Sequence, residues 1–292
     1  GLGVFCHEFS HCMGLPDMYD TNYSNTPTMG DWDLLASGSY NGPNGIGWCP
    51  AGWTSYERAY AGWLDIEELK AGDIITGMKD LEDYEGKAYA IYNDNHRDEF
   101  YLLENHKNRG WDAYTPEGGL LVIHVDYDKA LFDNNIVNSK GTFTPAQGYD
   151  GVYTNDHPRM APFSKIRSVT NETYYYTYPM EAPRGVLDSL TNVSKPAATL
   201  YNALADGSTL MGKPIYNIKK DAETGDISFS FMTKDTGAET AVSEIPYTED
   251  SFSAEDNVYD LTGKLVGKRT GSLKPGIYII GNKGRTRKII VR

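Results

Sequence analysis

The chain opens on the stretch that decides how the rest is interpreted, GVFCHEFSHCMGLPD at residues 3–17. In an α-helix, His7 and His11 are four residues apart, so their side chains project about 40° apart on one face and can share a metal ion. Glu8 lies one position further round the helix, where its carboxylate can reach a water on the open side of the metal. The stretch therefore predicts a metal-binding helix that carries its own general base.

The residues after the second histidine predict where the helix ends and what completes the site. Gly14 can adopt the left-handed conformation found at helix C-termini, and Pro16 cannot continue a helix. A catalytic zinc ion takes three protein ligands and leaves one position for water, so a third ligand must come from beyond the helix. We expect Asp17 to be this ligand, with Asp20 as the second choice. Two further carboxylates follow nearby, Asp31 and Asp33.

The full pattern H-E-x-x-H-x-x-G-x-x-D at residues 7–17 is more specific than its first five positions, and it is typical of metzincin-type Zn²⁺ sites. The alternative is a helix whose histidines and glutamate make only solvated or capping contacts. That alternative leaves the spacing of the glycine and the aspartate unexplained, so we favour zinc.

Residues 7–20 and 30–39 resemble the immune inhibitor A family of secreted bacterial metallopeptidases, of M6 type, and so do residues 99–105 and 118–126. The resemblance covers most of residues 1–232. It implies a zincin-like catalytic domain, protein or peptide substrates, and a secreted or cell-surface location.

The same resemblance implies that the strand holding an extended substrate lies upstream of the metal helix. We therefore expect the chain to be N-terminally truncated, to bind zinc weakly and to cleave poorly alone. One departure from the family is Leu35, which stands where a methionine usually lies beneath the metal; the two side chains have similar volumes, so a hydrophobic floor can survive. Tyr40 follows this turn and could stabilise an oxyanion, although a core or surface tyrosine is the more common case.

Composition excludes two classes of partner. The formal net charge of the 292 residues is −13, which argues against binding to nucleic acid phosphates. No apolar stretch approaches the roughly 20 residues that a membrane-spanning helix needs. The length allows two or three domains with their own cores.

The pattern along the chain predicts an α+β protein. Alternating apolar runs at residues 88–92, 100–104 and 120–125 indicate strands, bounded by clusters of Asn, Asp and Gly. The expected organisation has four parts: the C-terminal part of a zincin-like catalytic domain at residues 1–65, a β-rich, sandwich-like accessory domain at 66–232, a linker at 233–255 and a small β module at 256–292.

The final module contains three short apolar runs separated by glycine-containing turns. It resembles the C-terminal sorting domains of the Bacteroidetes type IX secretion system. The resemblance implies contact with a secretion machinery and export across an outer membrane.

Three weaker signals leave alternatives open. The loop at residues 17–25 collects oxygen ligands that could hold Ca²⁺, but a plain polar turn is favoured. His124 and Asp126 share one face of a strand and could face the cleft, but a hydrogen-bonded structural pair is favoured. The cysteines allow a disulfide from either helical cysteine to the third; otherwise they are buried small side chains. They are Cys6, Cys12 and Cys49.

Two functions follow from the whole sequence. The first is a secreted zinc endopeptidase in which His7, His11 and Asp17 bind Zn²⁺ and Glu8 activates water. The second is a non-catalytic surface or adhesion protein whose β-rich parts bind partners and whose metal helix is vestigial. The presence of Glu8 favours the enzyme, because loss of the general base is the simplest way to inactivate such a site.

Overall fold

The computed structural model describes residues 1–144, 150–163, 166–167, 174–175, 177–182, 185–235, 257–260, 262–268, 274, 276–282 and 285–291. The chain divides into two compact units, Gly1–Gly237 and Ala238–Arg292. The regions expected at residues 1–65 and 66–232 thus lie in the same unit. A domain boundary between them stays a prediction.

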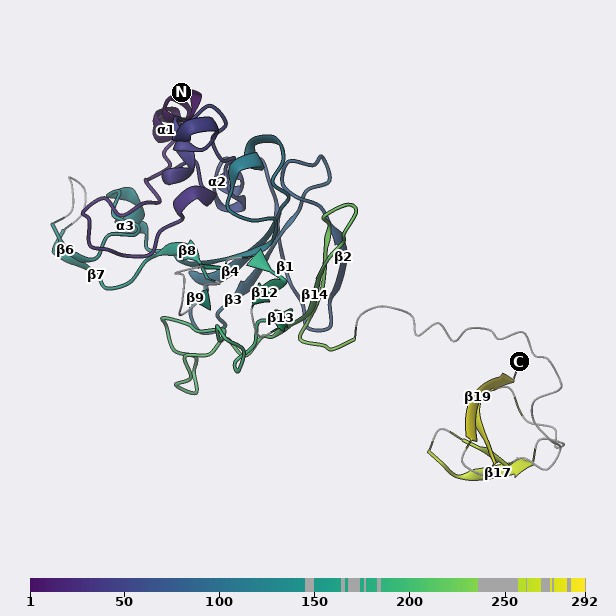
Figure 1. The fold of residues 1–292 in the computed structure, drawn as a ribbon. Helices are drawn as coiled ribbons and strands as arrows, with labels where there is room; N and C mark the ends of the chain where they lie inside the picture. Colours follow the sequence, from purple (N-terminus) through teal and green to yellow (C-terminus); the bar gives the residue numbers. More distant parts are fainter. Residues whose placement is uncertain are drawn as a thin grey trace. The chain divides into compact units, whose positions relative to one another are not determined.

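A main sheet forms the centre of the first unit (Figure 1). Its strand order is β1-β3-β4-β5-β11, and β8 pairs with β5 as a branch. Only the pair β1–β3 is parallel, and the other pairs of this sheet are antiparallel. The bounds are β1 Ile66–Glu68, β3 Ala88–Tyr92, β4 Glu99–His106, β5 Gly119–Asp126, β8 Met160–Pro162 and β11 Thr177–Tyr178. The strands predicted at residues 88–92, 100–104 and 120–125 are confirmed.

A second sheet of three strands has the order β14-β15-β2. Its strands are β2 Ile74–Met78, β14 Ile215–Lys220 and β15 Ile227–Phe231. Three two-stranded sheets complete the described β structure of the unit: β6 Gly141–Phe143 with β7 Tyr153–Asn155, β9 Ile166–Arg167 with β10 Tyr174–Tyr175, and β12 Met180–Ala182 with β13 Gly185–Leu187.

The central strands are buried on both faces, and successive residues enter two different cores. Leu103 and Val122 belong to the core shared with the three-stranded sheet. Leu102 and Leu121 belong to a second core, which also contains Leu15 and other residues of the N-terminal segment. This alternation is the period of two expected of a strand. The N-terminal segment is therefore packed directly on the main sheet.

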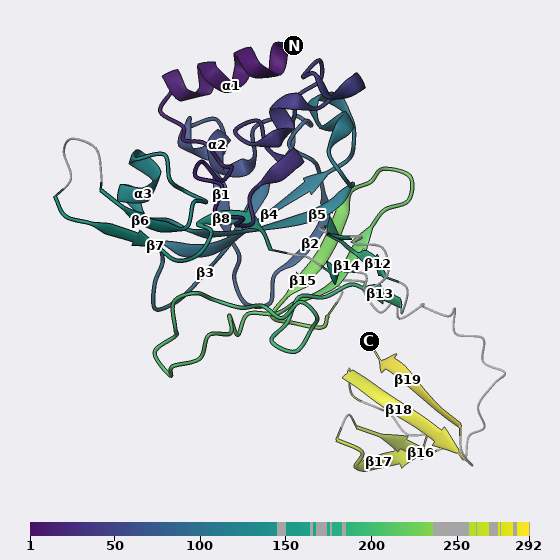
Figure 2. The ribbon, with the colours of Figure 1, turned by 60° about the vertical axis from the view of Figure 1, so that its left-hand side comes forward.

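The helices are short. The α-helices are α1 Leu2–Cys12, α2 Ser55–Tyr60 and α3 Lys129–Asp133, and the 3-10 helices are η1 Gly30–Trp32, η2 Ser37–Tyr40, η3 Pro43–Gly45 and η4 Gly110–Tyr114. Figure 2 shows α1 and α2 on one side of the main sheet, with β14 and β15 on the other. In the described part of the chain, no helix has the length and apolarity to cross a membrane.

The second unit contains a four-stranded antiparallel sheet of order β17-β16-β18-β19. The strands are β16 Asn257–Tyr259, β17 Leu265–Lys268, β18 Gly276–Asn282 and β19 Arg285–Val291. The linker expected at residues 233–255 lies almost wholly outside the described residues. The β character expected of the last module is observed, and its role in sorting stays a prediction.

A buried acidic cluster lies between the N-terminal segment and the main sheet. It contains four carboxylates, Asp33, Glu57, Glu104 and Asp112, and His106, all 5% exposed or less. His106 Nε2 lies 2.8 Å from Glu104 Oε1, and its Nδ1 lies 2.9 Å from Asp112 Oδ2. Burial acts to lower the pKa of His106, but these carboxylates outweigh it and raise the pKa to about 10. Protonated His106 therefore offsets part of the buried negative charge.

Asp33 and Glu57 are the other two carboxyl groups of this cluster. Burial raises the pKa of Glu57 to about 7, and burial together with the charge of Glu57 raises the pKa of Asp33 well above its ordinary range. Two carboxyl groups in such a place retain a proton between them at pH values where exposed carboxyl groups have lost theirs.

We predict that Glu57→Gln flattens the dependence of stability on pH. A raised folded-state pKa stabilises the protein below the unfolded pKa of about 4.5, and this stabilisation is lost as the pH rises through about 7. The loss for Glu57 is on the order of 3 kcal/mol, and a neutral amide does not show it. Denaturant unfolding between pH 4.5 and 7, with a chelator present, measures the slope of the unfolding free energy against pH.

The matched control is Glu223→Gln, which changes an exposed glutamate. It should keep the wild-type slope. Equal slopes for wild type and Glu57→Gln would contradict the prediction.

Candidate metal centre

The helix that carries the metal motif ends where the sequence predicts. α1 spans Leu2–Cys12, and Gly14 follows with φ +93°. A Cβ added at Gly14 would lie 2.6 Å from the hydroxyl oxygen of Tyr60 and would also strain the backbone. Glycine therefore allows the turn that brings the chain back towards the helix.

Each of the two histidines is oriented by a backbone carbonyl group that contacts its Nδ1 atom. His7 Nδ1 lies 2.8 Å from the carbonyl oxygen of Leu34, and His11 Nδ1 lies 2.8 Å from that of Leu15. A carbonyl oxygen can only accept, so each Nδ1 carries the proton and, in the neutral ring, each Nε2 keeps a free lone pair. This orientation is the one that metal-binding histidines require.

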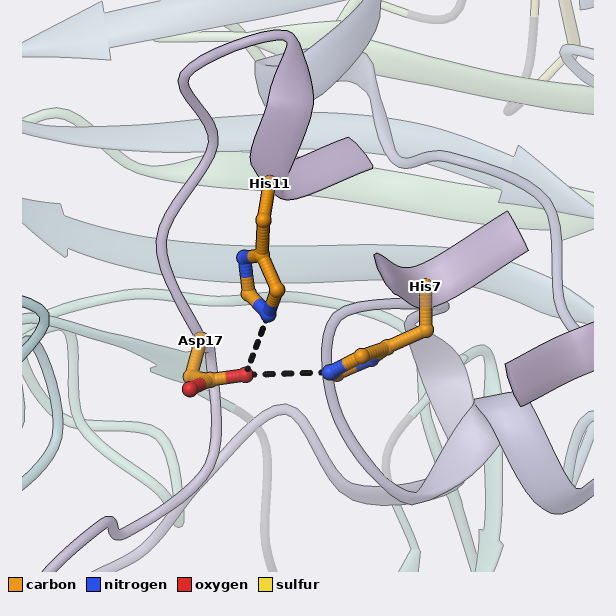
Figure 3. Close-up of side chains that lie close together, drawn as sticks. All are labelled: His7, His11 and Asp17. Carbon is orange, nitrogen blue, oxygen red and sulfur yellow. Dashed lines mark ion pairs between the residues drawn. The ribbon is translucent and has the colours of Figure 1, made fainter. Parts of the chain in front are cut away.

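Asp17 completes the cluster shown in Figure 3. Its Oδ1 atom lies 3.1 Å from His7 Nε2 and 3.2 Å from His11 Nε2. Asp17 is 5% exposed, and while both imidazoles are neutral its Oδ1 atom has no hydrogen-bond donor. Three atoms with lone pairs thus converge on one point, and a shared cation or proton is needed to stabilise them. Among the described residues, one group of three or more His, Cys, Asp or Glu side chains has its ligand atoms close enough together to hold a metal ion. This group is His7, His11 and Asp17.

The protonation of this cluster follows from the same contacts. The hydrogen bond to Asp17 raises the pKa of His7 above 6.5, although burial opposes the rise. Burial acts to raise the pKa of Asp17, but hydrogen bonds from His7 and Asn135 outweigh it, and the pKa is lowered. Without a metal, a proton on His7 can bridge the two groups.

The other carboxylates considered as third ligands point elsewhere. Asp20 accepts hydrogen bonds from Ser24 Oγ at 3.0 Å and from the backbone of its own loop. Asp31 is exposed, and buried Asp33 accepts from the backbone N–H of Leu35 at 2.7 Å. The bonds of Asp20 are those of the polar turn favoured for residues 17–25; a Ca²⁺ ion there stays a prediction.

Glu8 is exposed on α1, one position after His7. Its charge contributes to raising the pKa of both His7 and Tyr19, so its carboxylate lies near these two side chains. Tyr19 was not anticipated from the sequence. Its ring centroid lies 6.3 Å from that of His7, at an interplanar angle of 26°. Tyr40 is 56% exposed on η2, in agreement with the favoured interpretation as a core or surface tyrosine, and no described contact joins it to the three clustered residues.

Asn135 was also missed, because 118 residues separate it from Asp17. Its amide Nδ2 donates to Asp17 Oδ2 at 2.6 Å, and its Oδ1 accepts from the backbone N–H of Asp17 at 2.5 Å. No local pattern predicts such a contact.

Leu35 behaves as expected for a hydrophobic floor: it is fully buried in the same core as Leu15 and Met18.

Neither the cysteines nor the predicted pair of His124 and Asp126 belongs to this cluster. All three cysteines are free, and Cys12 is exposed, so neither the disulfide nor full burial is observed. His124 bonds to Glu99 at 2.8 Å, whereas Asp126 bonds to Arg159 at 2.6 Å. These buried residues therefore have structural partners, although they do not pair with each other as expected.

Comparison with known proteins gives matches that cover only part of the chain. A stretch of 79 residues is 33% identical to the pre-pro-metalloprotease PrtV of two strains of Vibrio cholerae, O1 M66-2 and O1 El Tor N16961. It covers 25% of this chain and 8% of either relative, so the chain spans only a small part of their length. No solved structure matches. Residues 1–63, which carry His7, His11 and Asp17, match the catalytic domain of the immune inhibitor A peptidases, family M6.

Proposed function

We propose that this chain is part of a secreted zinc-dependent endopeptidase, in which His7, His11 and Asp17 bind Zn²⁺ and Glu8 is the general base. The observation that carries the proposal is the convergence of two imidazole lone pairs and one buried carboxylate oxygen on a single point. Two nitrogen donors and one oxygen donor with an open fourth side are a typical donor set of catalytic zinc. The match of residues 1–63 to a peptidase catalytic domain supports it.

The residues of the chain divide the work of hydrolysis. A bound zinc ion supplies a Lewis acid that polarises the peptide carbonyl and lowers the pKa of water. Glu8 accepts a proton from the attacking water, whose oxygen forms a bond to the carbonyl carbon. Glu8 then gives the proton to the amide nitrogen, the carbon–nitrogen bond breaks, and a carboxylic acid and an amine are released. The exposure of Glu8 leaves room for substrate above it.

Zinc binding is the first prediction of this proposal. One Zn²⁺ per chain should bind and raise the unfolding temperature, and His11→Ala should remove this effect. Binding should weaken as the pH falls, because the metal needs neutral imidazole and the raised pKa of His7 lets a proton compete at pH values above 6.5. Competition with a chelator at pH 8, 7 and 6 measures the affinity.

His96→Ala is the matched control, because His96 is half exposed and lies outside the cluster. It should bind zinc as wild type does. Zinc binding that survives His11→Ala would count against the assignment.

The role of Glu8 gives a second prediction. Glu8→Gln should keep the zinc affinity, since the side chain is not a ligand, and should lower hydrolysis of an unfolded protein substrate by about 100-fold or more. The measurement is peptide release by the zinc-loaded full-length parent protein, alongside the chelator titration. A zinc-loaded parent that cleaves nothing would favour the non-catalytic alternative, and undiminished cleavage by its Glu8→Gln variant would exclude Glu8 as the base.

We also propose that the C-terminal unit directs export. The support is its β structure, a four-stranded sheet in a compact unit of its own, together with the sequence resemblance to sorting domains. Deleting residues 250–292 should abolish delivery to the cell surface or medium, while the shortened protein retained by the cell still binds zinc. Unchanged secretion of the shortened protein, detected by immunoblotting of cell fractions, would contradict this.

A further inference from the structure

The side chain of Asn135 holds Asp17 at two points. Its Oδ1 accepts from the backbone N–H of Asp17 at 2.5 Å, and its Nδ2 donates to Asp17 Oδ2 at 2.6 Å. The first bond fixes the backbone, and the second fixes the rotation of the carboxylate. Together they define both the place and the direction of this side chain.

The second bond decides which oxygen faces the histidines. Because Oδ2 is occupied by the amide of Asn135, Oδ1 is the atom left within 3.2 Å of both Nε2 atoms. A carboxylate free to rotate could offer either oxygen, or both at once. The amide therefore selects a single oxygen for the cation.

Asn135 is itself fixed by the end of α3. The helix finishes in a double hydrogen bond in which the N–H of Asn135 donates to the carbonyl of Phe132 at 3.1 Å and the N–H of Ile136 donates to that of Leu131 at 3.0 Å. Asn135 occupies the left-handed position of this helix-ending motif, with φ +59°. Leu131 and Phe132 are buried. The amide is thus carried on a rigid, core-anchored turn.

Glycine is the residue most often found at such a left-handed position, and asparagine is the common second choice. The turn alone therefore does not need the amide side chain. Asn138 on the same segment donates to the carbonyl oxygen of Met18 at 2.8 Å, so two amides support the loop that carries Asp17.

We propose that Asn135 is a positioning residue of the metal centre: its amide makes Asp17 a ligand through one oxygen and thereby sets the affinity and geometry of the bound ion. This inference rests on the proposed function, because it assumes that His7, His11 and Asp17 bind the metal. It assigns a role in the centre to a segment that lies far beyond the matched residues 1–63.

Asn135→Gly tests the inference, because glycine keeps the left-handed turn and removes only the amide. Zinc affinity of the full chain should fall about 10–100-fold, the usual effect of losing a residue that orients a metal ligand. The visible absorption of the Co²⁺-loaded chain should also change, since a rotating carboxylate alters the coordination. Unfolding of the metal-free chain should change no more than in the control.

The matched control is Asn217→Gly, since Asn217 has φ +55° and also donates side-chain hydrogen bonds, to Ser230 Oγ and the carbonyl of Lys234. It should keep the wild-type affinity and Co²⁺ spectrum. Asn135→Asp is the second variant: it keeps an acceptor for the backbone N–H of Asp17 but sets a carboxylate oxygen against Asp17 Oδ2, so the affinity should again fall.

The outcomes separate the two claims. Wild-type affinity together with an unchanged Co²⁺ spectrum in Asn135→Gly or Asn135→Asp overturns the role of Asn135 and leaves the proposed function standing. Zinc binding by wild type that His11→Ala does not affect overturns both. Loss of affinity in the two Asn135 variants but not in Asn217→Gly supports the inference.

Discussion

The contact between Asp17 Oδ1 and the two imidazole Nε2 atoms is the constraint on which the N-terminal part of this protein depends. Asp17 Oδ1 lies within hydrogen-bonding distance of both Nε2 atoms, and all three atoms carry lone pairs when the imidazoles are neutral. The Nδ1 protons cannot stabilise them, because each donates to a backbone carbonyl oxygen. Such an arrangement is unfavourable unless a positive charge lies among the three atoms. Either a proton or a metal ion can supply that charge, so the two compete for one place.

The supports of this contact come from the core beneath it. The carbonyls that orient the histidines belong to Leu15 and Leu34, and both side chains are buried in the core that covers one face of the main sheet. The backbone of Met18 donates to the carbonyl of Leu35 at 2.8 Å and ties the loop to the same layer. The core packed on the main sheet therefore fixes the geometry of the centre as much as α1 does.

The sequence predicts well what is local. The helix, its end at Gly14 and the approach of Asp17 all follow from spacing within one stretch, and the strands follow from alternation with a period of two. Asn135 and Tyr19 could not be predicted in the same way. The contact of Asn135 spans 118 residues, and Tyr19 has the same local appearance as Tyr40, so only the fold shows which tyrosine contacts His7.

The buried acidic cluster was missed for a related reason. Its members come from separate elements, and each carboxylate alone looks like a surface residue in the sequence. Strand β1 begins at Ile66, but a domain boundary at residues 65 and 66 stays a prediction. Nevertheless, Leu15 and Leu121 share a core across it, because a change in local pattern carries no information about which elements pack together.

The long separation between Asp17 and its amide partner has a consequence for synthesis. A chain emerges from the ribosome N-terminus first, so α1 and its histidines appear more than a hundred residues before the segment containing Asn135 and Asn138. Until that segment has folded, the two hydrogen bonds from Asn135 that orient the carboxylate of Asp17 are missing. The nascent chain thus carries an incomplete centre.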